Sequence, residues 1–319
     1  MFNFKKIKND PQSALLMKKR LTHGIVSFVR YFFLLALSYV VLFQLIFMIS
    51  YSIRPPVDAY NPSVVWIPSE FTLENFTVAY DSLDYLNSGL VSVYIMMIAA
   101  LIEVFTCAVI AYGFARFDFK EKGLVFFLVL VTIMVPVQML VVPMYLNFSH
   151  FDILGIGNLI REWTGTDIRP NMLNTAWTFY LPSLFGVGVR SGLFIFIYRK
   201  FFEGLPRELE EAAYVDGAGP LRTFLSVILP SSGVVFLTVT IFSSIWHWNE
   251  NYLSGLFLQE KPSLAVMMDL LDTSLEQNGG DNRMTRMAAC LLFILPMLIM
   301  YMILQRKFVQ SIDRVGIVG

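Results

Sequence analysis

The sequence lacks the motifs that bind nucleotide phosphates or metals. No G-x-x-x-x-G-K-[ST] stretch occurs, and the glycines from Gly186 to Gly192 lie inside an apolar run, not after a strand. The histidines (His23, His150, His247) show no H-E-x-x-H or other metal-ligand spacing. No nucleophile stands beside a base. We therefore expect no catalytic residue, no cofactor site and no metal site, and the net charge of zero favours no nucleic-acid partner.

Charge and cysteine are also scarce. Only 15% of the 319 residues are charged, against about 25% in a typical soluble domain, while 56% are hydrophobic. The two cysteines, Cys107 and Cys290, lie in apolar runs, so we expect packing roles and no disulfide. Residues 1–30 are basic but contain no small-residue cleavage site after a short apolar core, so no cleaved signal peptide is expected. This composition predicts a polytopic membrane protein.

Apolar runs predict an all-α transmembrane bundle of six spans. Several of the runs exceed the ~20 residues needed to cross a hydrocarbon layer. We expect a basic N-terminal segment at 1–30, a membrane domain at 31–304 and a tail at 305–319. Four prolines inside the runs should bend their helices: Pro136, Pro143, Pro182 and Pro296. The predicted spans are 31–53, 89–114, 124–148, 172–198, 231–248 and 287–304.

The distribution of basic residues predicts the orientation. The termini and the loops on their side carry 17 Lys and Arg, whereas the opposite loops carry 6. Cytoplasmic segments of membrane proteins are enriched in these residues. Both termini and the polar loop 203–230 are therefore expected in the cytoplasm, with the acidic loops outside.

The loop 203–230 has the pattern of two helices joined at a glycine. Pro206 suits a first helical position, Gly217 suits a left-handed helix end, and Pro220 can begin a second helix. Acids occupy the first turns, where the helix dipole favours them: Glu208, Glu210 and Glu211. A hairpin on the membrane surface is the alternative, but surface helices usually carry Lys and Arg. An acidic hairpin is better explained as a protein-docking element.

The same loop resembles a known family. Glu211-Ala-Ala-x-x-Asp216-Gly217, followed by Ile228-Leu229-Pro230, is similar to the EAA loop of permease subunits of binding-protein-dependent ABC importers. In that family the loop is the coupling helix that fits a groove on the ATPase. The resemblance implies the type I ABC-importer permease architecture. The residues that it assigns to ATPase coupling are Glu210, Glu211, Ala212, Ala213, Asp216 and Gly217.

Further segments resemble the carbohydrate-uptake branch, and most closely the second, six-span permease of the maltose-transporter type. They include Trp66-Ile-Pro68, Ala111-Tyr-Gly-Phe-Ala-Arg116, Met134-Val-Pro136 and Trp248-Asn249. The resemblance implies a bacterial cell-membrane location and four kinds of contact: a homologous permease, two ATP-binding cassette ATPase subunits, an extracytoplasmic solute-binding protein and membrane lipid. ATP would be bound by the partner subunits. The ending Gln310–Gly319 and the approach Gly192–Tyr198 depart from the family pattern.

Two ionisable residues fall inside predicted spans. Glu103 and Arg190 each cost about 2.5–3.5 kcal/mol at a bilayer centre on insertion scales, so each should face protein or water. One hypothesis is a polar pathway or a pair between the second and fourth spans, and the other is two satisfied structural groups. Trp248 and Asn249 end the fifth span, where an interfacial aromatic belt and a solute-contacting lining remain equally open.

The sequence therefore predicts a non-catalytic permease subunit of an ATP-driven solute importer, with carbohydrate as the favoured solute. An importer for another solute is one alternative. An ion-gradient-driven secondary transporter would explain Glu103 and Arg190 but not the acidic hairpin. A membrane receptor or scaffold would show no solute flux.

Overall fold

The computed structural model describes residues 11–62, 64, 66–152, 155–276 and 283–315, and helix is the only regular secondary structure within these. Among the described residues, three helical stretches are long and apolar enough to cross a membrane: Lys19–Ser52, Tyr85–Arg116 and Arg283–Arg306. The number rises to five if each of two bent helix pairs counts as one span. The predicted all-α membrane fold is therefore observed, with fewer unbroken spans than the six predicted.

A packed core of three helices organises the bundle. Helix α4 (Ile98–Arg116) lies against α9 (Ser191–Glu203) and α13 (Gly233–Trp248). It continues a longer helix made of α3 (Tyr85–Ser92) and a π-helical turn at Val93–Met97. Small residues on α4 let the neighbours approach closely, because they keep side-chain bulk out of the contact. The fully buried ones are Ala99, Cys107, Ala108 and Ala111.

The third and fourth predicted spans are broken, not continuous. Helices α5 (Lys122–Met134) and α6 (Val137–Ser149) meet at an angle of 102° beside Pro136, which supplies no backbone donor to continue the helix. The predicted span 172–198 contains α8 (Trp177–Leu184) and α9. Between them Gly186 and Arg190 adopt left-handed backbone conformations, with φ of 69° and 64°. Pro143, Pro182 and Pro296 lie inside helices α6, α8 and α16 (Arg283–Val315).

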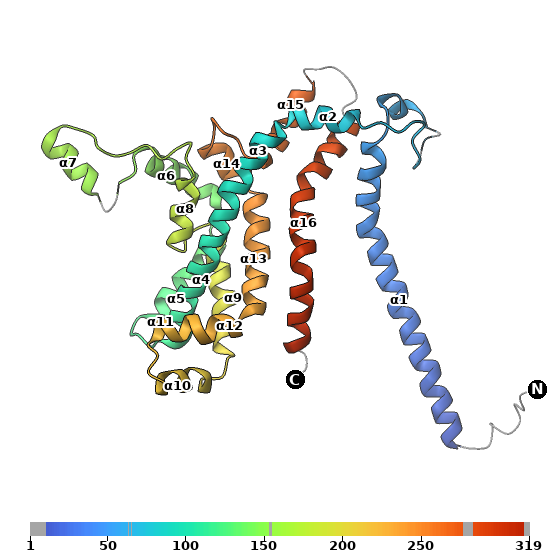
Figure 1. Ribbon diagram of the computed structural model, residues 1–319, viewed down its shortest axis with the longest axis horizontal. Helices are drawn as coiled ribbons and strands as arrows, with labels where there is room; N and C mark the ends of the chain where they lie inside the picture. The colour runs from blue at the N-terminus through green and yellow to red at the C-terminus, as the bar shows by residue number, and fades with distance from the viewer. Residues whose placement is uncertain (1–10, 63, 65, 153–154, 277–282, 316–319) are drawn as a thin grey trace, which may run out of the picture.

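Two long helices stand beside this core (Figure 1). Helix α1 (Pro11–Ser52) leans outward and contacts α16, while most of its described apolar side chains are exposed. The start of α1 and the C-terminal end of α16 lie at the end of the molecule that also carries α10 (Glu208–Val215). The start of α1 and the end of α16 thus lie on the same side as the loop 203–230, whereas residues 1–10 and 316–319, part of the predicted terminal segments, lie outside the described residues.

The opposite end is capped by short helices. Helices α2 (Glu74–Ser82) and α15 (Leu264–Glu276) pack there against α16, and α14 (Tyr252–Phe257) packs against α15 and α6. A 3₁₀ turn (Pro56–Tyr60) lies beyond the end of α1 (Figure 1). The connecting α7 (Ile156–Thr164) extends to one side. At the other end the chain turns through α11 (Pro220–Thr223), a π-helical turn (Phe224–Ile228) and α12 (Leu229–Ser231) before α13.

Replacing Gly192 with leucine should push α5 and α9 apart. A Cβ at this position would lie 2.5 Å from Thr132 Oγ1 and 3.0 Å from the carbonyl oxygen of Val129. Overpacking of this kind costs about 1–3 kcal/mol. We expect a lower thermal unfolding midpoint in detergent, measured by tryptophan fluorescence. The matched control is Gly113→Ala on α4, where a Cβ meets nothing within 4 Å; an equal loss there would contradict the packing explanation.

Candidate functional site: a helical hairpin and a buried polar cluster

The hairpin predicted at 203–230 forms with the expected turn. Gly217 has φ of 80°, and the backbone N–H of Ala218 donates to the carbonyl oxygen of Ala213 at 2.9 Å, closing the end of α10. Pro220 is the first residue of α11, as predicted. The first helix begins at Glu208, two residues after Pro206, which the sequence predicted as its first residue. Glu203 ends α9 and pairs with Arg199 at 2.7 Å and Lys200 at 3.0 Å.

Glu210 lies beneath the hairpin, in contact with α4. Its Oε1 is 2.5 Å from Nε of Arg116, and its Oε2 accepts a hydrogen bond from the Tyr112 hydroxyl at 3.3 Å. Arg116 also donates from Nη2 to the carbonyl oxygen of Leu205 at 2.9 Å. The two charged side chains are only 6% and 7% exposed. This buried lock, formed by Tyr112, Arg116 and Glu210, fastens α10 and the segment before it to the end of α4.

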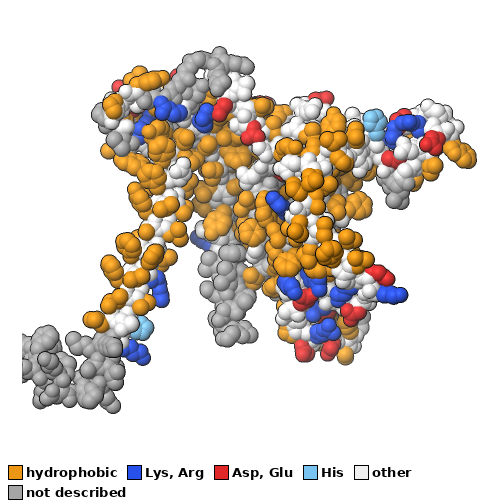
Figure 2. Space-filling model, turned by 180° about the vertical axis from the view of Figure 1, so that it is seen from behind, with side chains coloured by type: hydrophobic (Ala, Val, Ile, Leu, Met, Phe, Trp, Pro, Cys, Tyr) orange, Lys and Arg blue, Asp and Glu red, His pale blue; other side chains and the backbone are white. Residues whose placement is uncertain are grey.

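The other face of α10 is open. Of the residues assigned to coupling, Ala213 is buried with Glu210, whereas Glu211, Ala212, Asp216 and Gly217 are exposed. Apolar side chains stand among them: Leu209, Tyr214, Val215 and, on α11, Leu221. Figure 2 shows charged side chains of both signs gathered over this end, next to a mostly hydrophobic body. An exposed face with an apolar centre and a charged rim has the composition of a protein-docking surface.

Glu103 lies in a buried polar cluster between α4, α9 and α13. Ser191 donates to its Oε1 at 2.5 Å, and Ser243 donates to its Oε2 at 2.7 Å. Nδ1 of His247 is 2.9 Å from the carbonyl oxygen of Ser243, which can only accept, so Nδ1 carries the proton. The same Nδ1 is 3.6 Å from Glu103 Oε2. All four residues are at most 1% exposed, so the cluster joins three helices across the core.

The hypothesis that Glu103 pairs with Arg190 does not match this geometry. Within the described part of the chain, the partners of Glu103 are the two serines and His247, while Arg190 is exposed with its guanidinium 5.9 Å from the Trp246 ring centroid. Arg190 also acts on Glu250: burial raises the pKa of Glu250, and the charge of Arg190 opposes that rise.

Trp248 and Asn249 diverge at the end of α13. Trp248 is 2% exposed, packs near Phe293, and donates from Nε1 to the Phe293 carbonyl oxygen at 3.1 Å. It therefore belongs to the core rather than to an interfacial belt in this conformation. Asn249 is exposed, and its side-chain amide donates to the carbonyl oxygen of Ile245 at 2.7 Å.

Several residues of both sites were not predicted from the sequence. Arg116 and Tyr112 stand in the Ala111–Arg116 segment, where the resemblance noted them without a partner. Nothing in the sequence indicated a buried cluster at Ser191, Ser243 or His247, because single serines and histidines in apolar runs are common. The spacing of Ser243 and His247, four residues apart on one helix, indicates a shared face but no partner.

Replacing Glu103 with leucine should destabilise the three-helix core. Ser191 and Ser243 would lose their acceptor, and each buried polar group left unpaired costs about 1–3 kcal/mol. We expect a reduced yield of folded protein and a lower unfolding midpoint. Glu103→Gln keeps an acceptor and a donor of the same shape and should stay close to wild type. If leucine is tolerated as well as glutamine, the cluster is not a structural tie.

The fold and its sites define a class: a helical membrane protein with long apolar helices and an exposed polar hairpin at one end. Comparison with known families names the group. Residues 105–314 match the family described as "binding-protein-dependent transport system inner membrane component". The match covers more than half of the chain, so this protein belongs to that family and is an ABC transporter permease subunit.

Permeases that are named for the uptake of particular sugars match most of the chain's length. The chain is 25% identical over 309 residues to the arabinooligosaccharides transport system permease AraQ of Halalkalibacterium halodurans, covering 94% of this chain and 100% of that one. It is also 25% identical over 248 residues to the diacetylchitobiose uptake permease NgcG of Streptomyces coelicolor, covering 78% and 75%. A solved bacterial ABC transporter involved in alginate import shares the fold, with a TM-score of 0.65, 19% identity and coverage of 90% and 98%.

Proposed function

We propose that this protein is the permease subunit of an ATP-driven importer for carbohydrates. The observation that carries the proposal is the exposed face of α10, held rigidly to α4 by the buried lock of Tyr112, Arg116 and Glu210. A rigid exposed hairpin can transmit movement to the helices behind it. The solute class comes from the names of two relatives, one for arabinooligosaccharide transport and one for diacetylchitobiose uptake. Another relative is named for sn-glycerol-3-phosphate transport, so a phosphorylated polyol is the alternative solute class.

In this proposal the chain crosses the bilayer six times. The spans are α1, α3–α4, α5–α6, α8–α9, α13 and α16, and α10 lies in the cytoplasm with both termini. Glu211, Ala212, Asp216 and Gly217 face an ATPase subunit, one of two in the complex. Ala213 and Glu210 support them from beneath. A homologous permease completes the pathway, and an external binding protein delivers the solute. ATP is bound by the partner subunits.

Nucleotide-driven closure of the ATPases would move α10, and the lock would pass that movement to α4. Since α4 shares the Glu103 cluster with α9 and α13, the three helices would move as one body. The broken spans at Pro136 and at Gly186–Arg190 provide places where the surrounding structure can change angle. ATP and solute then shift the population between outward-open and inward-open states.

The proposal is tested with the reconstituted complex in liposomes that contain ATP. We expect uptake of a labelled oligosaccharide that needs ATP and the binding protein, and that an ionophore does not reduce. Uptake that persists without ATP and collapses with the ionophore would support the secondary-transporter alternative instead. Stimulation of the ATPase by glycerol phosphate but not by oligosaccharides would keep the permease role and replace the solute.

A further inference from the structure

Helix α7 sits on an arm that leaves the body and returns to the same place. At its base the backbone N–H of Phe151 donates to the carbonyl oxygen of Pro170 at 3.0 Å, and that of Met172 donates to the carbonyl oxygen of Phe148 at 2.8 Å. The arm extends sideways, level with the ends of α13 and α16 that lie opposite α10 (Figure 1). A base closed by two backbone hydrogen bonds holds the arm in one direction.

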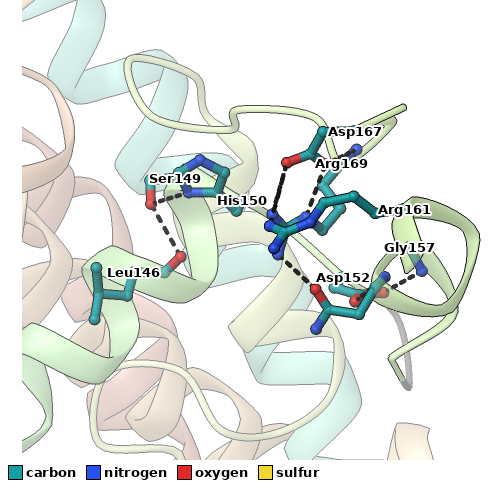
Figure 3. Close-up of polar contacts among 9 residues, drawn as sticks. Leu146, Ser149, His150, Asp152, Gly157, Arg161, Asp167 and Arg169 are labelled. Carbon is teal, nitrogen blue, oxygen red and sulfur yellow. Dashed lines mark hydrogen bonds and ion pairs between the residues drawn. The ribbon is translucent and has the colours of Figure 1, made fainter. Parts of the chain in front are cut away.

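A polar network fixes the orientation of α7 on the arm. The Asp152 carboxylate accepts from the backbone N–H groups of Gly157 at 2.7 Å and Asn158 at 2.9 Å (Figure 3). Arg169 donates to Asp167 at 2.6 and 2.8 Å and to Asn158 Oδ1 at 2.8 Å. These Arg169 hydrogen bonds hold the pKa of the Asp167 carboxyl well below its usual range, so it stays charged. Hydrogen bonds of Asp152 and Arg169 therefore tie the start of α7 to its own arm.

Large apolar side chains cover the free side of α7. Ile156, Leu159 and Trp163 are spaced three and four residues apart, which places them on one face. They are 52%, 58% and 89% exposed. Figure 2 shows hydrophobic side chains at the tip of the arm and charged ones nearer its base. Rigidly presented apolar residues at such exposure mark a contact surface.

The position and charge of the arm indicate which kind of partner contacts the apolar face of α7. Helix α6, which leads to the base of the arm, also exposes apolar side chains at Val142 and Leu146. The charged residues around α7 are of both signs, with three acids and two bases: Asp152, Glu162, Asp167, Arg161 and Arg169. A strongly charged partner would gain little here. Tryptophan with aliphatic neighbours on a short amphipathic helix is suited to the boundary between lipid headgroups and acyl chains.

We propose that α7 is an interfacial anchor that lies in the outer membrane–water boundary with Ile156, Leu159 and Trp163 inserted into lipid. The placement of α7 on the outer side rests on the orientation given under the proposed function. The contact of its apolar face with lipid does not depend on that orientation. The anchor would hold the α6–α8 segment at a fixed depth beside the broken third and fourth spans.

The test uses the complete transport complex in nanodiscs of phosphatidylcholine and phosphatidylglycerol. Trp163→Cys carries a polarity-sensitive fluorophore, and the matched control is Glu162→Cys, one residue away and about 100° around the helix. The unmutated complex, labelled in parallel, reports background from Cys107, which is buried, and Cys290, which is partly buried. We expect blue-shifted emission at position 163 and several-fold stronger quenching by nitroxide-labelled lipid than at position 162.

Two outcomes would overturn the anchor. If position 163 is water-like in nanodiscs and becomes protected only when the solute-binding protein is added, the face is a protein dock. If it is water-like under both conditions, the face contacts neither. Orientation is read separately, because a membrane-impermeant maleimide should reach Glu162→Cys from outside intact spheroplasts. Labelling only after permeabilisation would reject the orientation and leave the lipid contact intact.

Discussion

Replacing Glu210 with alanine should abolish ATP-driven uptake, because it breaks the buried lock that joins α10 to α4. Arg116 is 6% exposed and would be left without its carboxylate partner. Removing one member of a buried ion pair costs about 3–5 kcal/mol, mainly because the other charge stays desolvated. We expect the hairpin to detach from α4 while the spans remain folded. The measurement is loss of ATPase co-purification and of uptake with normal amounts of permease in the membrane.

The matched control for this variant is Glu211→Ala, the next residue along the chain. Its side chain is exposed, so its removal leaves no buried charge. Because Glu211 faces the ATPase in the proposed complex, its removal should weaken that contact but should not detach the hairpin from α4. A double variant, Arg116→Met with Glu210→Met, removes both charges and should recover part of the association. If Glu210→Ala retains the ATPase as well as Glu211→Ala does, the lock does not position the hairpin.

Replacing Gly217 with valine should uncouple the complex for a different reason. A Cβ at Gly217 would meet nothing within 4 Å, so space is not the constraint. The constraint is the backbone: φ is 80°, and a residue with a Cβ pays about 1–2 kcal/mol in the left-handed region, more when it is β-branched. The turn that closes α10 onto Ala218 should open. We expect solute-stimulated ATP hydrolysis to fall sharply while the membrane bundle keeps its unfolding midpoint.

Gly219→Ala is the control for the turn. This glycine has φ of −78° and also meets nothing within 4 Å, so alanine fits without strain. It should leave both uptake and hydrolysis near wild type. Equal losses in Gly217→Val and Gly219→Ala would show that any side chain in this segment disturbs the ATPase contact, and the backbone explanation would then fail.

The sequence predicted the hairpin more accurately than the membrane spans. Gly217 and Pro220 act through their own backbone preferences, so their effects are local and can be predicted from the sequence alone. The third and fourth spans were less predictable. Apolar runs report only that a segment is compatible with lipid, and they do not report where neighbours permit a break. The angle at Pro136 and the left-handed Arg190 depend on packing against other helices.

By itself, the sequence determined the class of protein, the side chains available for chemistry and the turn at Gly217, because composition, motif and backbone preference are properties of the chain. Only the tertiary structure decided that Glu210 is buried against Arg116 while Glu211 is free, and that Glu103 joins Ser191 and Ser243 instead of Arg190. Those partners are separated by 88 to 140 residues along the chain. Helix packing brings these distant residues together, and a local sequence pattern cannot predict such contacts.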